Sequence, residues 1–165
     1  MLQPANIETT GGKPAFYRDL TASLAALLDG ERDPVSNAAN TSALLFMMMP
    51  ALNWAGFYFL RDGGELVLGP FQGKPACVRI PAGRGVCGAA VERGRSILVE
   101  DVHAFAGHIA CDAASRSELV VPLVADGRVL GVLDLDSPDP ARFDSDDQAG
   151  MERIAAIYVS ASHAP

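Results

Sequence analysis

The chain has 165 residues, of which 49% are hydrophobic and 20% are charged, and its formal net charge is -7. This length and composition predict one soluble domain with a full hydrophobic core. The acidic charge disfavours nucleic acid as a partner, because it repels phosphate groups. The sequence contains neither a run of about 18 apolar residues nor the basic-then-apolar start of a signal peptide, so we expect no membrane span and a cytoplasmic protein.

The predicted elements follow one another as helices, strands and a final helix. Residues 1–13 show no apolar period, which predicts a flexible tail before a single domain at 14–165. The predicted helices cover 16–28, 34–49 and 86–93, and a last helix begins within 144–147. The predicted strands cover 54–60, 65–71, 77–80, 96–99, 118–124 and 128–135. This order indicates an α+β fold in which helices pack on one face of a mostly antiparallel sheet.

Two aspartates, Asp134 and Asp136, stand two residues apart in the last predicted strand. Side chains alternate along a strand, so both should lie on one face, together with Leu130 and Val132. Apolar residues on both faces predict a central strand. Two carboxylates at the end of such a strand repel each other and need a partner, such as a bound cation. The alternative is a pair of solvated carboxylates without a function.

The hairpin turn decides whether Glu118 joins these aspartates. A two-residue loop, Asp126-Gly127, pairs residue 119 with 134 and sends Glu118 to the opposite face. A three-residue loop that also includes Ala125 pairs Glu118 with Asp134, and then all three carboxylates share one face. The sequence alone leaves both registers open.

The cysteines Cys77, Cys87 and Cys111 are odd in number and lack a C-x-x-C spacing. This disfavours a disulfide scaffold and a zinc site, and the simplest interpretation is three buried thiols that act as small hydrophobic side chains. Cys111, however, lies in a polar segment with His108 and Arg116, cations of the kind that lower the pKa of a reactive thiol. Acidic neighbours would act in the opposite direction.

Several motifs, in order along the chain, together carry a family resemblance. They are N-W-A-G-F-Y at 53–58, G-P-F-Q-G-K-P-A-C at 69–77, G-R-G-V-C-G at 83–88, H-I-A-C-D at 108–112 and G-V-L-D-L-D-S at 131–137. The sequence resembles the free methionine-(R)-sulfoxide reductases, which are stand-alone GAF domains, and departs from their pattern at Ala106, where proline is expected. The resemblance implies a six-stranded antiparallel sheet with the N- and C-terminal helices on one face and a ligand pocket on the other.

The resemblance also implies residue roles. Cys111 is then the nucleophile, Cys77 the resolving cysteine and Cys87 a secondary thiol. The residues that it implies for substrate binding are Glu118, Asp134, Asp136, Trp54 and Tyr58. We expect no cofactor and no metal, and thioredoxin as the reductant of the disulfide. The sequence leaves the oligomeric state open, and a homodimer is compatible with it.

The chemistry of these residue types agrees with that activity. Attack of a Cys111 thiolate on a sulfoxide sulfur requires a proton for the departing oxygen, and Glu118 or Asp136 would supply it. The other carboxylates would pair with the α-ammonium group of a free amino acid, and the sulfenic acid on Cys111 would condense with Cys77. Two other hypotheses remain: a GAF domain that only binds a small ligand and regulates a partner, and an interaction module with buried thiols.

Overall fold

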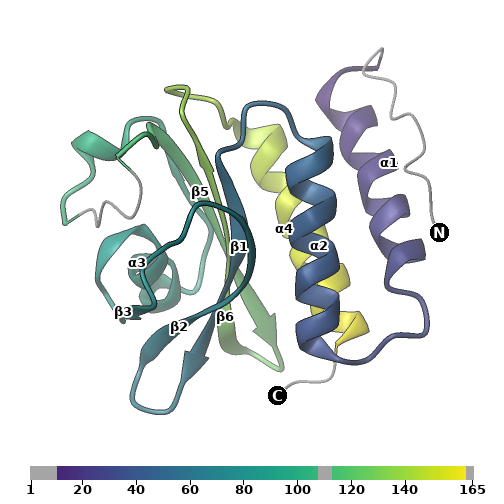
Figure 1. Ribbon diagram of the computed structural model, residues 1–165, viewed down its shortest axis with the longest axis horizontal. Helices are drawn as coiled ribbons and strands as arrows, with labels where there is room; N and C mark the ends of the chain where they lie inside the picture. Colours follow the sequence, from purple (N-terminus) through teal and green to yellow (C-terminus); the bar gives the residue numbers. More distant parts are fainter. Residues whose placement is uncertain (1–10, 108–112, 163–165) are drawn as a thin grey trace.

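One antiparallel sheet separates two layers of the molecule (Figure 1). The computed structural model describes residues 11–107 and 113–162. The six strands are β1 (Trp54–Arg61), β2 (Glu65–Gly73), β3 (Arg79–Pro81), β4 (Ile97–Val99), β5 (Ser117–Ala125) and β6 (Arg128–Ser137). They lie in the order β3-β2-β1-β6-β5-β4. The predicted α+β class with an antiparallel sheet is therefore confirmed.

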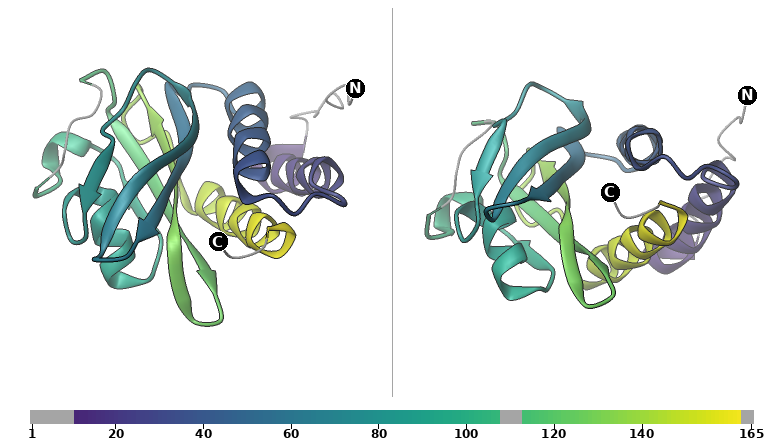
Figure 2. Two further views of the ribbon diagram at one scale, coloured as in Figure 1. Left: turned by 60° about the horizontal axis from the view of Figure 1, so that its bottom comes forward. Right: turned by 90° about the horizontal axis from the view of Figure 1, so that it is seen from below.

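Three helices cover one face of the sheet and a fourth lies on the other. Figure 2 shows α1 (Gly12–Leu27), α2 (Pro34–Met48) and α4 (Ser145–Ala161) together on one side, and α3 (Gly85–Arg93) on the opposite side. A short 3-10 helix, η2 (Val102–Ala104), follows β4. The start of α1 corrects the predicted tail, because Lys13 belongs to this helix. Its Nζ lies 2.7 Å from Asp144 Oδ2, a long-range contact that local sequence patterns do not reveal.

The helix ends follow the capping signals of the sequence. The side chain of Asp33 accepts a hydrogen bond from the Ser36 amide at 2.7 Å, directly before the first-turn proline of α2. Gly94 ends α3 in the left-handed conformation, with φ 59°. Asp144 and Asp147 form a capping box at the start of α4.

The turn between β5 and β6 has two residues, Asp126 and Gly127, and both adopt left-handed φ values of 50° and 75°. Such a turn matches the right-handed twist of the strands that it joins. The three-residue loop that would have placed Glu118 beside the aspartates is therefore wrong.

A bulge in β6 nevertheless brings the carboxylates together. Val124 pairs with Val129, whereas Leu123 pairs with Gly131, so β6 holds one extra residue, Leu130. This residue shifts the register by one, and Glu118 then pairs with Asp136 while Val120 pairs with Asp134. Glu118 thus shares a face with both aspartates. The bulge also turns Leu130 toward the helix side, where it packs, instead of the predicted face.

Each face of the central strands contributes to its own apolar layer. Leu133 and Leu135 belong to the core between the sheet and the three helices. Val132 belongs to a second core under α3, as the alternation predicted. Glu118, Asp134 and Asp136 therefore lie on the same face of the sheet as this second core.

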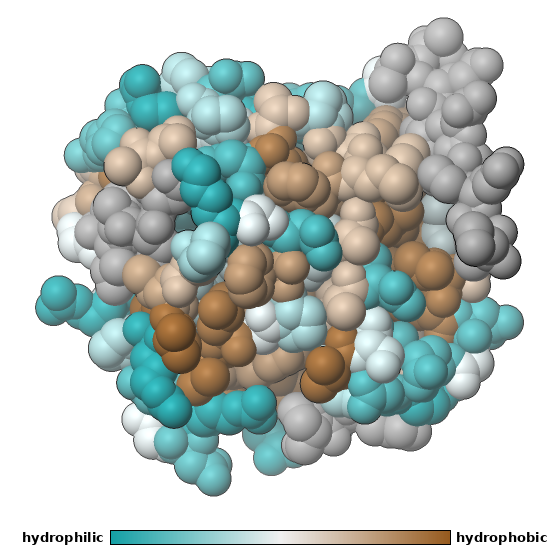
Figure 3. Space-filling model, viewed as in Figure 1, coloured by the Kyte–Doolittle hydropathy of each residue, from teal (hydrophilic) through white to brown (hydrophobic). Residues whose placement is uncertain are grey.

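Hydrophobic groups on the face drawn in Figure 3 are interrupted by hydrophilic ones. The large hydrophobic side chains most exposed on α2 are Val35, Phe46 and Met47. Within the described ranges, none of the helices combines the length and the apolar character that crossing a membrane requires.

Candidate active site

A pocket lies between the start of α3 and the sheet, on the face opposite α1, α2 and α4. About 550 Å³ of space within it, including its open mouth, is not filled by protein atoms. Its lining comprises Trp54, Tyr58, Lys74, Pro75, Ala76, Ile80, Arg84, Gly85, Val86, Cys87, Ser115, Glu118, Asp134 and Asp136. All five residues predicted to bind substrate therefore line one pocket.

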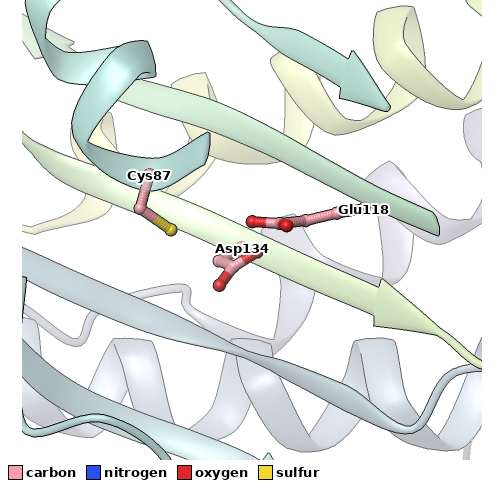
Figure 4. A group of neighbouring side chains, drawn as sticks. All are labelled: Cys87, Glu118 and Asp134. Carbon is pink, nitrogen blue, oxygen red and sulfur yellow. The ribbon is translucent and has the colours of Figure 1, made fainter. Parts of the chain in front are cut away.

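Three buried groups from three separate elements meet at the floor of this pocket (Figure 4). Cys87 extends from α3, Glu118 from β5 and Asp134 from β6. Glu118 and Asp134 are each only 6% exposed. The bulge at Leu130 aligns the two carboxyl groups, because it places both on this face of the sheet.

Burial dominates the ionisation of these carboxyl groups. It raises the pKa of Glu118 well above its ordinary value, and the charges of Asp134 and Asp136 add to the effect. Burial also raises the pKa of Asp134 to about 7, although hydrogen bonds from the Cys87 thiol and the Leu135 amide oppose this shift. The pair therefore retains a proton near neutral pH, so it can donate that proton or exchange it for a cation.

Cys87 is a free, buried thiol, only 4% exposed. Burial raises its pKa well above the ordinary value, and the negative charges of Asp134 and Glu118 raise it further. The thiol remains protonated at neutral pH and is a poor nucleophile. Its hydrogen bond to Asp134 instead makes it a structural neighbour of the carboxyl groups.

Trp54 and Tyr58 form an aromatic wall of the pocket, and their ring centroids lie 5.8 Å apart. Phe71, which is not among the lining residues, stacks on Trp54 at a centroid distance of 5.3 Å. Sequence reasoning missed Phe71, although it stands in one of the motifs. The absence of a side chain at Gly56 leaves room for Trp54 and Phe71 to stack. A Cβ at this position would lie only 2.6 Å from Trp54 Cη2 and 2.4 Å from Phe71 Cβ.

Two hydrogen bonds tie the aromatic wall to the loop before β3. Trp54 Nε1 donates to the Lys74 carbonyl oxygen at 3.2 Å, and the Tyr58 hydroxyl donates to the Cys77 carbonyl oxygen at 3.0 Å. Lys74 was also missed, although it too stands in the motif at 69–77. The loop that carries Cys77 is thus fixed directly against the pocket.

The cysteines have different states and surroundings. Cys77 is half-buried and disulfide-bonded, whereas Cys87 is free. Cys111, the predicted nucleophile, lies outside the described residues, as does His108. Arg116, the other cation predicted to assist Cys111, lies with its Nη2 3.8 Å from Asp101 Oδ2.

Ser115, which follows Cys111 by four residues, lines the pocket. It is 3% exposed, and its Oγ accepts a hydrogen bond from Asn53 Nδ2 at 3.1 Å. Sequence reasoning did not single out Ser115 or this contact, because the two residues are 62 positions apart.

Known proteins are similar to this chain over most of its length. Residues 46–161 match the family model of the GAF domain. The chain is 55% identical over 144 residues to the free methionine-R-sulfoxide reductase of Escherichia coli (strain K12), covering 87% of both chains. It is 54% identical over 153 residues to protein YtsP of Bacillus subtilis (strain 168), covering 92% of this chain and 94% of YtsP.

A solved structure extends the similarity to the fold. The X-ray structure of free methionine-R-sulfoxide reductase from Neisseria meningitidis in complex with its substrate superposes with a TM-score of 0.90 at 44% identity. The superposition covers 96% of this chain and 95% of that one. The similarity therefore includes the sheet, the covering helices and the elements that line the pocket.

Proposed function

The chain belongs to the GAF-domain family and, within it, to the free methionine-R-sulfoxide reductases, and we propose that it reduces free L-methionine-(R)-S-oxide to methionine. It is an oxidoreductase of this family. The observation that carries the assignment of substrate is the pocket itself, in which buried carboxyl groups with raised pKa values lie beside an aromatic wall.

The pocket suits the α-ammonium group of a small free amino acid. The α-ammonium group of the substrate would pair with Asp134 and Asp136 and would replace the proton that Asp134 holds near neutral pH. The ε-methyl group would pack on Trp54. A methionine sulfoxide within a peptide has no such ammonium group, so the proposal includes a preference for the free amino acid.

The chemical step transfers one oxygen atom and two electrons. The Cys111 thiolate attacks the sulfoxide sulfur, the S–O bond breaks, and the oxygen finishes on Cys111 as a sulfenic acid while methionine leaves. The substrate sulfur is reduced by two electrons and the cysteine sulfur is oxidised by two. We assign the proton donor for the oxygen to Glu118, because burial keeps its carboxyl group protonated.

The sulfenic acid on Cys111 is then converted into a disulfide, which an external dithiol can reduce. The Cys77 thiol condenses with the sulfenic acid, water leaves, and a dithiol of the thioredoxin class reduces the resulting disulfide. Two observations support Cys77 rather than Cys87 as the resolving residue. Cys77 is disulfide-bonded, and Cys87 is a buried free thiol whose pKa is raised.

The test incubates the reduced protein with free methionine-(R)-sulfoxide and dithiothreitol and measures methionine by amino-acid analysis. We expect product from this epimer and much less from the (S)-epimer or from the N-acetylated (R)-sulfoxide, which has no ammonium group. Cys111→Ser should form no methionine. Binding of the sulfoxide without methionine formation by the wild type would instead favour a ligand-binding GAF module.

The recycling step has a separate test. Cys77→Ser should complete a single turnover but should lose sustained turnover with thioredoxin. Cys87→Ser is the matched control, and it should keep thioredoxin-driven turnover. Undiminished turnover of Cys77→Ser would remove Cys77 from the resolving role.

A further inference from the structure

The floor of the pocket places one sulfur ligand and two oxygen ligands around a common point. The Sγ of Cys87 and one carboxylate oxygen each from Glu118 and Asp134 all lie within 4.8 Å of one another, and all three residues are buried. Figure 4 shows the three side chains converging from α3, β5 and β6 on the same space. Two strands and a helix therefore hold these groups together without any local sequence motif.

One oxygen of this group is short of a partner. Asp134 Oδ1 is buried and accepts no hydrogen bond within the described ranges, 11–107 and 113–162. An unsatisfied buried acceptor costs free energy, and the cost is larger when the group is charged. Because Asp134 lines the pocket, a cation that enters the pocket can satisfy this oxygen directly.

We propose that Cys87, Glu118 and Asp134 form a binding site for a divalent cation of the zinc class. Thiolate and carboxylate ligands together suit zinc, cadmium and cobalt, whereas magnesium and calcium prefer oxygen ligands alone. The chain carries a net charge of -7, which favours entry of a cation. Such a site differs from a cysteine-only zinc site, which the spacing of the three cysteines disfavours.

The geometry fits a tetrahedral ion after small side-chain movements. Two ligand atoms of a tetrahedral zinc ion with these donors lie about 3.5 Å apart. Because no two of the three ligand atoms lie more than 4.8 Å apart, a contraction of at most about 1.3 Å brings them to this spacing, and rotation of the Glu118 and Asp134 side chains can supply it. The fourth position faces the pocket and remains open to water.

Metal binding and substrate binding exclude each other. This part rests on the proposed function, in which Asp134 receives the ammonium group of the substrate and Glu118 supplies a proton. A divalent ion occupies both carboxyl groups and displaces the protons of the thiol and of Glu118. Zinc should therefore inhibit the enzyme in competition with the sulfoxide, and binding should release protons.

The binding test uses the full chain with Cys77→Ser and Cys111→Ser, which leaves Cys87 as the only cysteine. Addition of Co²⁺ under oxygen-free conditions should produce thiolate-to-cobalt absorption that saturates at one ion per chain, and Zn²⁺ should abolish it. The absence of this absorption would overturn the proposal. So would an unchanged affinity for zinc, measured by calorimetry, when Cys87→Ser is added to the double variant.

The oxygen ligands are tested in the same background. Asp134→Asn should weaken cobalt binding at least tenfold, and the control Asp126→Asn, which changes an exposed turn residue, should leave it unaltered. Equal affinities in these two variants would show that surface carboxylates bind the ion, and the proposal would fail. If Asp134→Asn loses its near-ultraviolet circular dichroism, Glu118→Gln replaces it in the same comparison.

The inhibition test measures single-turnover methionine formation by pre-reduced wild-type protein without free thiols, because thiols chelate zinc. Zinc should raise the sulfoxide concentration that gives half of the maximal single-turnover rate, and in Cys87→Ser the zinc concentration for half-inhibition should rise at least tenfold. Cobalt binding without inhibition would overturn the exclusion of substrate. Failure of the wild type to form methionine at all would reject the proposed function, and the cobalt spectrum of the double variant would remain independent of that result.

Discussion

Two buried acidic residues on opposite faces of the sheet differ in how the fold neutralises them. Asp147, at the start of α4, is 1% exposed and contacts Lys13, the Tyr17 hydroxyl at 2.7 Å and Arg142 Nη1 at 3.3 Å. Asp134, in the pocket, is 6% exposed, and its Oδ1 accepts no hydrogen bond from the described residues. The fold thus surrounds Asp147 with its own cations, whereas it leaves one carboxylate oxygen of Asp134 available to a ligand.

This difference separates a structural carboxylate from a binding carboxylate. A buried charge is tolerated when cations and hydrogen bonds surround it, and Asp147 has both. A buried carboxyl group without them shifts its pKa and takes up a proton, as Asp134 does. Loss of Asp147 should therefore harm the fold, whereas loss of the pocket carboxyl groups should harm activity.

The largest expected effect is on catalysis. Glu118→Gln keeps the shape of the side chain but removes the acidic proton proposed for the departing oxygen. We expect kcat/KM for free methionine-(R)-sulfoxide to fall on the order of a thousandfold, which lies within the range of general-acid contributions. Steady-state assays with dithiothreitol measure this fall.

Glu100→Gln is the matched control, because Glu100 is exposed directly after β4. It should keep wild-type activity. The urea midpoint of Glu118→Gln should be equal to or above that of the wild type, because the substitution removes a buried acid. A loss of activity that accompanies a loss of folding would contradict the contrast with Asp147.

The second effect concerns the stability of the helix layer. Asp147→Asn removes the charge that joins Lys13, Tyr17 and Arg142, and it should lower the free energy of unfolding by about 3 kcal/mol. Urea unfolding measures this change, with Asp126→Asn as the exposed control. Single-turnover activity at low temperature should persist, since the pocket lies on the other face. A change below about 0.5 kcal/mol would show that the three contacts contribute little.

The sequence predicted part of the pocket from strand alternation alone. Asp134 and Asp136 lie on one face with Val132, as their spacing requires. The position of Glu118 could not be derived, because it depends on a bulge at Leu130, and nothing in that apolar run marks where an extra residue enters. With the two-residue turn alone, Glu118 would lie on the opposite face from the aspartates, and the bulge returns it to their face.

Long-range contacts account for most of what the sequence did not reveal. The capping signal at Asp144 predicted the start of α4, but the contact of Lys13 with Asp147 joins residues 134 positions apart. The sequence therefore assigned Lys13 to a tail. The stack of Trp54 with Phe71 was likewise hidden, although Gly56 and Gly73 in the motifs mark the close approach of strands β1 and β2.

The third prediction concerns the pH dependence of stability. The pKa of Asp134 is about 7 in the folded protein and 3.8 at its ordinary value, so between these limits the folded state holds a proton that the unfolded state has lost. The proton that Asp134 retains should then lower stability by about 1.4 kcal/mol for each pH unit between pH 4 and pH 7. Asp134→Asn should remove this contribution and leave the fall that the raised pKa of Glu118 causes, as urea titrations at several pH values can measure.

The Lys13 cluster should respond to pH with the opposite sign. The hydrogen bond from Lys13 lowers the pKa of Asp144 to about 2, so its stabilising contribution is present above pH 4 and is lost as the pH falls toward 2. Asp144→Asn should reduce the loss of stability below pH 4, and it should leave the change of stability with pH between pH 4 and pH 7 unaltered. Equal slopes for wild type and Asp134→Asn above pH 4 would contradict the raised pKa of Asp134.

The smallest expected effect isolates one hydrogen bond of Asp147. Tyr17→Phe removes the hydroxyl but keeps the ring, which packs so closely on Gly150 that a Cβ there would lie 2.2 Å from Tyr17 Cδ1. The free energy of unfolding should fall by about 1 kcal/mol, because Asp147 retains Lys13 and Arg142. In the Asp147→Asn background the same substitution should cost clearly less, and this double-mutant cycle measures the coupling between the two residues. Equal costs in both backgrounds would show that the hydroxyl stabilises the helix layer without Asp147, whereas the expected coupling would confirm that α1 docks onto α4 through this carboxylate.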